Sequence, residues 1–364
     1  MASFPILKLP SLAFREVARH LGLFELIEMC QCSKRMLQLL KLADPNRLKL
    51  SIEIFGSTTT IRIGSSYRFA VYPTTAVRLK MFNPQKYLVF EGVQVPYLFI
   101  RGVNKEVLAF WEDAVQRGCA MVHYFMKIFD SDVDFFDSGK LDYTRFCDIM
   151  NHILKRQKSI EVLGVSTKWV KLNELLSQIQ VTRELFINLE LDSNFELKMP
   201  HQPTNLKIFK SSWFTLASLL SMNCVRISLH DSLLSNMEIN TYLDQWKIGN
   251  LPSLKNFVIR GKNLRDREPI YGVQPPIRIE DNQLKTHRAV FSNYDISVLG
   301  GVEIQSDTGV QAVIQMEFSY KTPYFCFLVF DDENVLGEES KFNTVYHYRP
   351  RDTKNPFDVS DFNF

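Results

Sequence analysis

Short apolar segments recur through the middle of the chain, and this recurrence limits the possible folds more than any other feature. Five of them lie between residues 159 and 260: SIEVLGV, RELFINLEL, NLKIFKS, CVRISLH and LKNFVIR. Their Leu, Ile, Val and Phe content favours β-strands. Their centres are about 20–30 residues apart, which is the spacing of stacked strand–helix units. Such a unit cannot bury its apolar face alone, so we expect neighbouring units to stack side by side.

The expected fold class is therefore mixed, α+β or α/β. Residues 48–260 are predicted to form an irregular strand–helix arc similar to leucine-rich repeats, although the asparagine ladder of a regular repeat is absent. The segment NMEINTYLDQWKIG predicts an amphipathic helix that ends at Gly249. Nearer the N-terminus we expect strands from Leu48 onward, AVRLKMF (76–82) and AMVHYFMKIF (120–129) among them, and helices over 105–118 and 142–157.

The part after Gly261 differs in composition. A charged, proline-containing connection leads to residues 270–346, where SVLGGVEIQ, VQAVIQMEF and YFCFLVF predict an antiparallel β meander. Ser306–Gly309 should form a hairpin turn in which Gly309 takes a positive φ. Residues 347–364 have no periodicity and are predicted to form a mobile tail.

Residues 4–44 predict a separate unit of three short helices. Pro10 and Ser11 can begin the first helix, FELIEMCQ forms the second, and Ser33 can cap the third. In the first helix we expect Val17 and Leu21 to face inward and to hold the unit together.

Composition excludes several classes of function. Hydrophobic residues make up 46% of the chain and charged residues 23%, which is too apolar for a disordered protein. A net charge of +3 gives no sign of binding to nucleic acid or to a membrane. Six scattered cysteines fit reduced thiols, and no apolar run is long enough to cross a bilayer. We therefore expect an intracellular protein of the cytoplasm or nucleus.

No motif prescribes a reaction or a cofactor. DSDVDFFDSGKL (130–141) begins like a calcium loop, but Phe135 and Leu141 occupy the positions that require Gly and Glu, so a turn with solvated acids is predicted. His230 and Asp231 are neighbours in a predicted strand and should point to opposite faces. Trp111, Trp169, Trp213 and Trp246 are all expected in the core. We predict a protein that is not an enzyme and that holds no cofactor or metal.

Two parts of the chain resemble known families. Phe4 to Lys41 resembles an F-box, a three-helix module that docks substrate receptors onto ubiquitin ligases, through Leu9-Pro10, ELI (25–27) and CSKRM (32–36). Ser211 to Ile259 is similar to the type 2 F-box-associated region of the nematode F-box family, through Trp213, LASLLSMN, INTYLDQW and LPSLKNFVI. We place that region at about 185–260.

The resemblance implies a substrate receptor of an SCF-type cullin-RING ubiquitin ligase. Its F-box would bind a Skp-family adaptor and, through it, a cullin, while the rest of the chain would recruit a target protein that the sequence does not name. The residues expected to contact the adaptor are Leu9, Pro10, Phe14, Leu23, Leu26, Ile27, Lys34 and Met36. The alternative is a leucine-rich-repeat-like interaction scaffold whose N-terminal helices only cap the end of the arc.

Overall fold

The structure is a computed structural model of the whole chain. It describes residues 9–21, 23–32, 38, 49–64, 67–75, 80–82, 84, 86–90, 93–100, 105–129, 131–139, 141–277, 286–291, 294–318 and 322–330. The expected third N-terminal helix, apart from residue 38, and the C-terminal tail lie outside these ranges.

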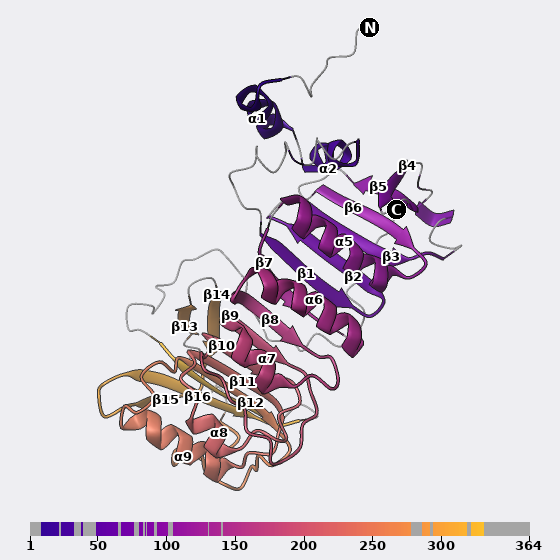
Figure 1. Ribbon diagram of the computed structural model, residues 1–364. Coiled ribbons are helices and arrows are strands. Elements are labelled where there is room, and N and C mark those ends of the chain that lie inside the picture. Colours follow the sequence, from indigo (N-terminus) through magenta and orange to yellow (C-terminus); the bar gives the residue numbers. More distant parts are fainter. Residues whose placement is uncertain are drawn as a thin grey trace. The chain divides into compact units, whose positions relative to one another are not determined.

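Two compact units are distinguished. Unit 1 comprises residues 1–214 with 229–231, and unit 2 comprises the rest of the chain. Each unit contains a β-sheet and helices (Figure 1), which agrees with the predicted mixed class. The boundaries predicted at 48–260 and 270–346 stay predictions.

Parallel strands form one part of the sheet of unit 1. Five strands are neighbours in the order β1, β7, β8, β9, β10, and each strand is parallel to the next one in this order. The elements are β1 (Leu50–Phe55), β7 (Val133–Asp137), α6 (Tyr143–Arg156), β8 (Ser159–Val165), α7 (Leu172–Gln178), β9 (Gln180–Ile187) and β10 (Asn205–Ile208). Strands β7 to β10 follow one another in the chain and in the sheet, as the predicted strand–helix arc requires.

Antiparallel pairs extend this sheet beyond β1. The strand order continues β2, β3, β6, β5, β4, and only the β3–β6 pair is parallel among these five strands. Their bounds are β2 (Thr58–Ile63), β3 (Tyr67–Pro73), β4 (Lys86–Phe90), β5 (Val93–Ile100) and β6 (Lys105–Trp111). Helix α5 (Ala114–Phe129) packs on β1, β2, β3 and β6, so its apolar face closes the core of this part.

Unit 2 contains the predicted C-terminal meander. β15, β16 and β17 are successive antiparallel neighbours, and β17 also pairs antiparallel with β12. The elements of this region are α8 (Leu216–Leu220), β11 (Arg226–Ser232), α9 (Asn236–Lys247), β12 (Asn256–Gly261), β13 (Thr286–Phe291), β14 (Tyr294–Leu299), β15 (Val302–Gln305), β16 (Gln311–Glu317) and β17 (Tyr324–Val329). β11 divides between the two units. Gly309 has φ 88° in the turn between β15 and β16, as predicted.

The prediction for residues 105–129 was wrong, because a strand and a helix exchange places there. Residues 107–111 of β6 are all buried, and a strand covered on both faces has no alternation that distinguishes it from a helix. Gly118 does not end a helix. It lies inside α5, where a Cβ would collide with the side chain of Thr59 on β2, so this glycine permits close packing of helix on sheet.

Three smaller predictions also need correction. Residues 80–82 are helical rather than part of a strand. The predicted strand SVLGGVEIQ is broken into β14 and β15 at Gly300 and Gly301, which both have positive φ. The predicted turn at 130–141 contains the strand β7. Asp134 and Asp137 lie on this strand, and burial raises the pKa of both carboxyl groups.

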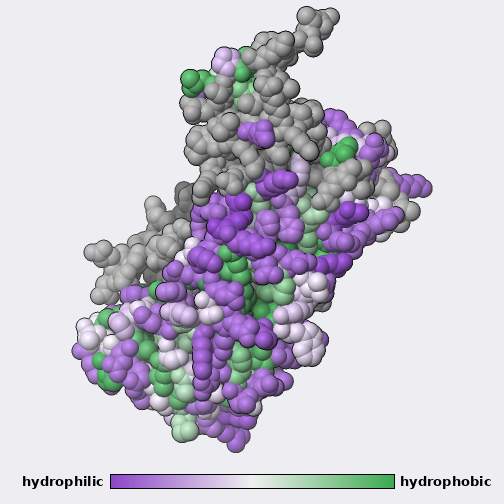
Figure 2. All heavy atoms as spheres, viewed as in Figure 1, coloured by the Kyte–Doolittle hydropathy of each residue, from purple (hydrophilic) through white to green (hydrophobic). Residues whose placement is uncertain are grey.

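The face of the molecule that Figure 2 shows is largely hydrophilic in its described part. Figure 2 shows hydrophilic residues over much of the face that bears α5 and α6. Among the described residues, no helix is long and apolar enough to cross a membrane.

Candidate functional site

The N-terminal helices place the predicted adaptor residues on different sides. α1 (Ser11–His20) begins after Pro10, whose carbonyl accepts a hydrogen bond from the Phe14 N–H at 2.9 Å. Pro10 is exposed and Leu9 is half-buried, whereas the Phe14 side chain is only 1% exposed. Phe14 therefore belongs to the interior of the chain, and its expected contact with an adaptor stays a prediction.

α2 (Leu23–Cys32) repeats this division. Ile27 is fully buried and Leu26 is half-buried. Leu23 lies in the helix, but its side chain is outside the described residues, as are Lys34 and Met36 entirely.

The prediction that Val17 and Leu21 of the first helix face inward was partly wrong. Val17 is 37% exposed, while Ala18, one position further, is buried. Leu12, which the sequence pattern did not single out, is 65% exposed. The exposed apolar side chains described in α1 are thus those of Leu12 and Val17, and Pro10, the residue before the helix, is also exposed. The exposure of Leu12 was detectable in the sequence, because Leu12 does not lie on the helix face that contains Phe14 and Ala18.

Helix α2 also makes contacts inside unit 1. The Phe24 ring lies 5.5 Å from the Tyr97 ring and 5.2 Å from the Phe99 ring, both on β5. Distances of this size between tilted rings are those of packed aromatic pairs. Burial raises the pKa of the Tyr97 phenol. This helix is therefore attached to the sheet through aromatic residues.

A second candidate region surrounds helix α9 of unit 2. The helix begins with a capping box, in which the Ser235 hydroxyl accepts a bond from the Glu238 N–H and the Glu238 carboxylate accepts one from the Ser235 N–H. Trp246 packs against Phe327 of β17, with ring centroids 4.9 Å apart. The helix is thus fixed at its start by polar contacts and near its end by a buried indole.

Two asparagines on one face of α9 hold a long loop. Asn236 is fully buried: its amide nitrogen donates to the carbonyls of Arg265 and Glu268 at 2.9 and 2.6 Å, and its amide oxygen accepts from the Arg265 N–H at 2.9 Å. Asn240, four residues later, bonds the Pro269 carbonyl and the Tyr271 N–H. Side chains four apart lie one above the other on a helix, so the pair clamps successive parts of the loop.

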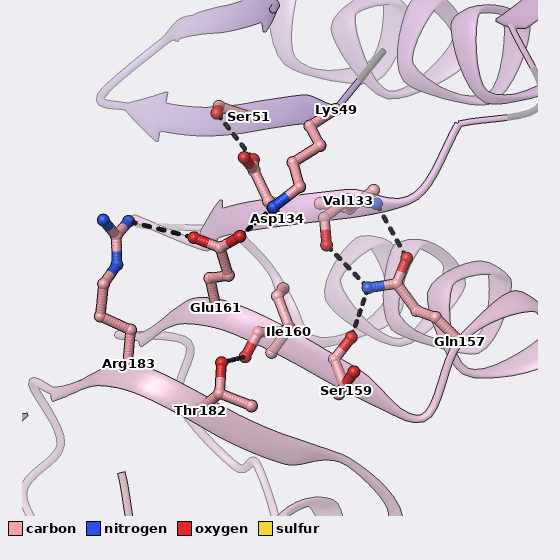
Figure 3. A network of polar contacts seen from close by, with 10 residues as sticks. All are labelled: Lys49, Ser51, Val133, Asp134, Gln157, Ser159, Ile160, Glu161, Thr182 and Arg183. Atoms are coloured by element: carbon pink, nitrogen blue, oxygen red, sulfur yellow. Dashed lines mark hydrogen bonds and ion pairs between the residues drawn. The ribbon is translucent and has the colours of Figure 1, made fainter. Parts of the chain in front are cut away.

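A ladder of polar side chains crosses the strands of unit 1 (Figure 3). Lys49 bonds Glu161 on β8, and Arg183 on β9 lies 3.9 Å from the other carboxylate oxygen of Glu161. The hydrogen bond from Lys49 lowers the pKa of Glu161 and raises the pKa of Lys49. Ser51 on β1 donates to Asp134 on β7 at 2.9 Å. These charges satisfy one another, so the ladder ties strands together and leaves little charge for a ligand.

Gln157 completes this ladder at the strand starts. Its amide exchanges two hydrogen bonds with the backbone of Val133 at 2.7 and 2.8 Å, and donates a third to the Ser159 carbonyl at 2.7 Å. β7 and β8 are therefore held in register by a side chain from the end of α6.

A groove of about 490 Å³ lies between α5 and α6. It is lined by Gln116, Cys119, Ala120, His123, Asp142, Thr144, Arg145 and Asp148. Burial raises the pKa of the Cys119 thiol to about 11, which makes the thiol a poor nucleophile. Arg145 is occupied by ion pairs to Asp113 and Asp142, both at 3.1 Å. In the described part of the chain no three His, Cys, Asp or Glu side chains gather as metal ligands. The Cys119 thiol is therefore not an activated nucleophile, and the Arg145 guanidinium is already paired.

Comparison with known proteins identifies one of these regions. Residues 194–259 match a family model described as F-box associated. The match includes β10, α8, β11, α9 and the first part of β12, and it lies within the region predicted at about 185–260. The chain therefore carries an F-box-associated region. No curated protein and no solved structure matches the chain.

Proposed function

We propose that the chain is a non-catalytic substrate receptor of an SCF-type cullin-RING ubiquitin ligase. Residues 4–44 act as the F-box and bind a Skp-family adaptor, which in turn binds a cullin. The rest of the chain recruits a target protein for ubiquitination. The receptor accelerates transfer by holding target lysines near the ubiquitin-conjugating enzyme, which raises their effective concentration.

The match of residues 194–259 to the F-box-associated model carries this proposal. Leu12 and Val17 of α1 and the preceding Pro10 have exposed apolar side chains that a bound partner would cover, which is compatible with the proposal. The nematode relationship implied by the resemblance belongs to the same proposal.

Co-purification tests the proposal. The full chain is co-expressed with a tagged Skp-family adaptor, and retention on the tag is measured for the unaltered chain and for a Leu9→Ala/Pro10→Ala variant. Neither residue is fully buried, so the variant should fold and yet lose the adaptor. Met237→Ala, at a 72% exposed position on α9, is the matched control and should retain it. If the unaltered chain does not retain the adaptor, the proposal is wrong.

One observation favours the alternative, an interaction scaffold without a ligase. The packing of Phe24 on Tyr97 and Phe99 is what an N-terminal cap on the sheet would need. Deleting residues 1–44 distinguishes the two functions. A cap is required for stability, so its loss should lower the unfolding temperature of the remainder sharply, whereas loss of a docking module should abolish adaptor binding and leave a folded remainder.

A further inference from the structure

The sheet face opposite helix α6 carries a row of side chains across strands β7 to β10, which lie side by side in unit 1 (Figure 1). On the helix side, Phe136 of β7 stacks on Phe146 of α6, with ring centroids 6.0 Å apart. Successive residues of a strand point to opposite faces, so Asp137, the last residue of β7, lies on the face away from α6. This face of β7 therefore ends in a carboxylate.

The pairing of the strands continues this face from β7 to β10. Asp137 pairs with Gly164 of β8, Gly164 pairs with Phe186 of β9, and Phe186 pairs with Lys207 of β10. Paired residues of neighbouring strands have their side chains on the same face of a sheet. We call these four residues the β7–β10 row.

Contacts join the members of the row into one surface. A Cβ on Gly164 would lie 2.7 Å from Oδ1 of Asp137, so the carboxylate lies directly over the glycine. The Lys207 Nζ lies 6.0 Å from the centroid of the Phe186 ring and 4.7 Å from that of Phe209, which follows β10. The side chains of Asp137, Phe186, Lys207 and Phe209 are all partly exposed. The row thus has an aromatic centre and opposite charges at its two ends.

Neither end charge of the row has an ion-pair partner among the described residues. Oδ1 of Asp137 accepts a hydrogen bond from the Gly139 N–H at 3.0 Å. Burial raises the pKa of the Asp137 carboxyl, the bond from Gly139 lowers it, and the charge of Glu53 raises it. Glu53 itself is paired with Arg62 at 3.3 Å. A carboxylate that is partly removed from water is stabilised by a nearby cation, so Asp137 offers a place for a cation from outside.

We propose that the β7–β10 row binds an extended segment of a target protein that carries a basic, an apolar and an acidic side chain at positions i, i+2 and i+4. The basic side chain pairs with Asp137, the apolar one packs on Phe186, and the acidic one pairs with Lys207. Both signs of charge are needed, which favours a peptide. A nucleic acid presents a line of anions that Asp137 would repel.

The spacing of the three side chains follows from the geometry of the sheet. β7 and β10 are separated by β8 and β9, so three strand spacings lie between Asp137 and Lys207. This distance is about 14 Å, and an extended chain covers about 3.4 Å per residue. About four residues therefore span the row, and side chains at i, i+2 and i+4 of an extended segment point to the same side.

This inference rests on the proposed function, since it names where the receptor holds its target. Adaptor binding was assigned to the N-terminal helices, which are separate from the row. Peptide binding and adaptor binding can therefore be measured independently on the same full-length chain.

Peptide selection tests the proposal. The full-length chain is used to select binders from random dodecapeptides displayed on phage, and we expect the enriched peptides to share the basic, apolar and acidic pattern. Asp137→Asn keeps the oxygen that accepts the Gly139 N–H and removes only the charge. A synthetic copy of the best peptide should bind this variant about fivefold or more weakly, and Phe186→Ala about tenfold or more weakly, than the unaltered chain.

A charge exchange separates pairing from misfolding. Lys207→Glu should bind the selected peptide about tenfold or more weakly, and a peptide whose acidic residue is replaced by Lys should recover binding to this variant. Lys86→Gln and Tyr87→Ala lie on β4, at the far end of the sheet of unit 1, and both side chains are exposed. They are the matched controls and should leave the affinity unchanged.

Tryptophan fluorescence checks that each variant is folded. Trp111, Trp213 and Trp246 are at most 8% exposed, so unfolding would shift their emission to longer wavelength. Trp169 was expected in the core with them, and that prediction was wrong: its side chain is 85% exposed, because it lies in the loop between β8 and α7. A variant with unchanged emission and weakened peptide binding has lost a contact and kept its fold.

The proposal is overturned if no peptide is enriched, if the enriched peptides lack the basic, apolar and acidic pattern, or if Asp137→Asn and Lys207→Glu bind the peptide as tightly as the unaltered chain. It is also overturned if a single-stranded oligonucleotide displaces the peptide. Retention of the adaptor separates the two proposals. Row variants that lose the peptide and retain the adaptor support both, whereas an unaltered chain that binds the peptide and no adaptor refutes only the receptor function.

Discussion

The clamp formed by Asn236 provides a quantitative test of how the F-box-associated region is stabilised. Asn236→Ala removes three hydrogen bonds between α9 and the backbone of Arg265 and Glu268. Each such bond contributes about 1 kcal/mol net, and exposed loop groups regain some bonds to water, so we expect a loss of about 2–3 kcal/mol in the free energy of unfolding. Asn240→Ala removes two bonds at a half-buried position and should cost about 1 kcal/mol.

Asn236→Asp separates this explanation from helix electrostatics. The residue lies in the first turn of α9, where a carboxylate alone would stabilise the helix by about 0.3–1 kcal/mol. In Asn236→Asp one carboxylate oxygen can still accept the bond from the Arg265 N–H. The other oxygen replaces the amide nitrogen and faces the carbonyl oxygens of Arg265 and Glu268, which lose their donor. We therefore expect this variant to be at least as unstable as Asn236→Ala at neutral pH.

Urea unfolding followed by tryptophan fluorescence measures these differences, because Trp246 lies in the same helix. Hydrogen exchange of residues 262–277 should accelerate in both Asn236 variants. If Asn236→Asp is as stable as the unaltered chain, or if Asn240→Ala is the more damaging of the two alanine variants, the buried clamp is not what holds this loop.

Three further predictions concern unit 1 and the cysteines. Gly139→Ala should lower the free energy of unfolding by more than about 2 kcal/mol, because Gly139 has a φ of 49° and a new Cβ would collide with the Ile54 carbonyl. Gly56→Ala is the control: Gly56 also has a positive φ but has open space around it, so this variant should cost clearly less in the same urea titration. Gln157→Ala should cost about 1–3 kcal/mol by freeing the backbone of Val133 at the start of β7, whereas Gln178→Ala, at an exposed position on α7, should cost less than about 0.5 kcal/mol. Burial raises the pKa of Cys119 from 9.0 to about 11 and that of Cys224 from 9.0 to about 12. Both thiols therefore contribute stability that is present below pH 9 and is lost as pH rises through these values. The free energy of unfolding, measured between pH 8 and 11, should show this fall, and a double Cys→Ala variant with the same pH dependence would contradict it.

The strand–helix part of the chain was largely predictable from local pattern. The segments around β8 to β12 alternate with turns and helices at a spacing that short-range periodicity reveals, and helix α6 was expected at 142–157. Gly309 adopts the positive φ expected for its turn, since that geometry depends on a few residues. The F-box-associated region was likewise predicted, from Trp213, Trp246 and the helices near them, and its match at 194–259 confirms it.

The exchange of strand and helix at 105–129 was not predictable in the same way. Val107 to Trp111 are buried in a strand that lies between β3 and β5 and under α5, and the local sequence does not indicate those neighbours. Gly118 has the local character of a helix end, yet its role is set by Thr59, which is distant in sequence. Tertiary contacts override propensity when a segment is buried on several sides.

The sequence alone therefore determined the mixed class of the fold, the order of most elements from residue 142 onward, and the presence of an F-box-associated region. Only the tertiary structure decided which apolar residues face outward. Phe14 and Ile27 lie inside, whereas Leu12, Val17 and Trp169 are exposed. The physical reason is that hydrophobicity and periodicity are properties of a segment, whereas the exposure of a side chain depends on which distant segments pack against it.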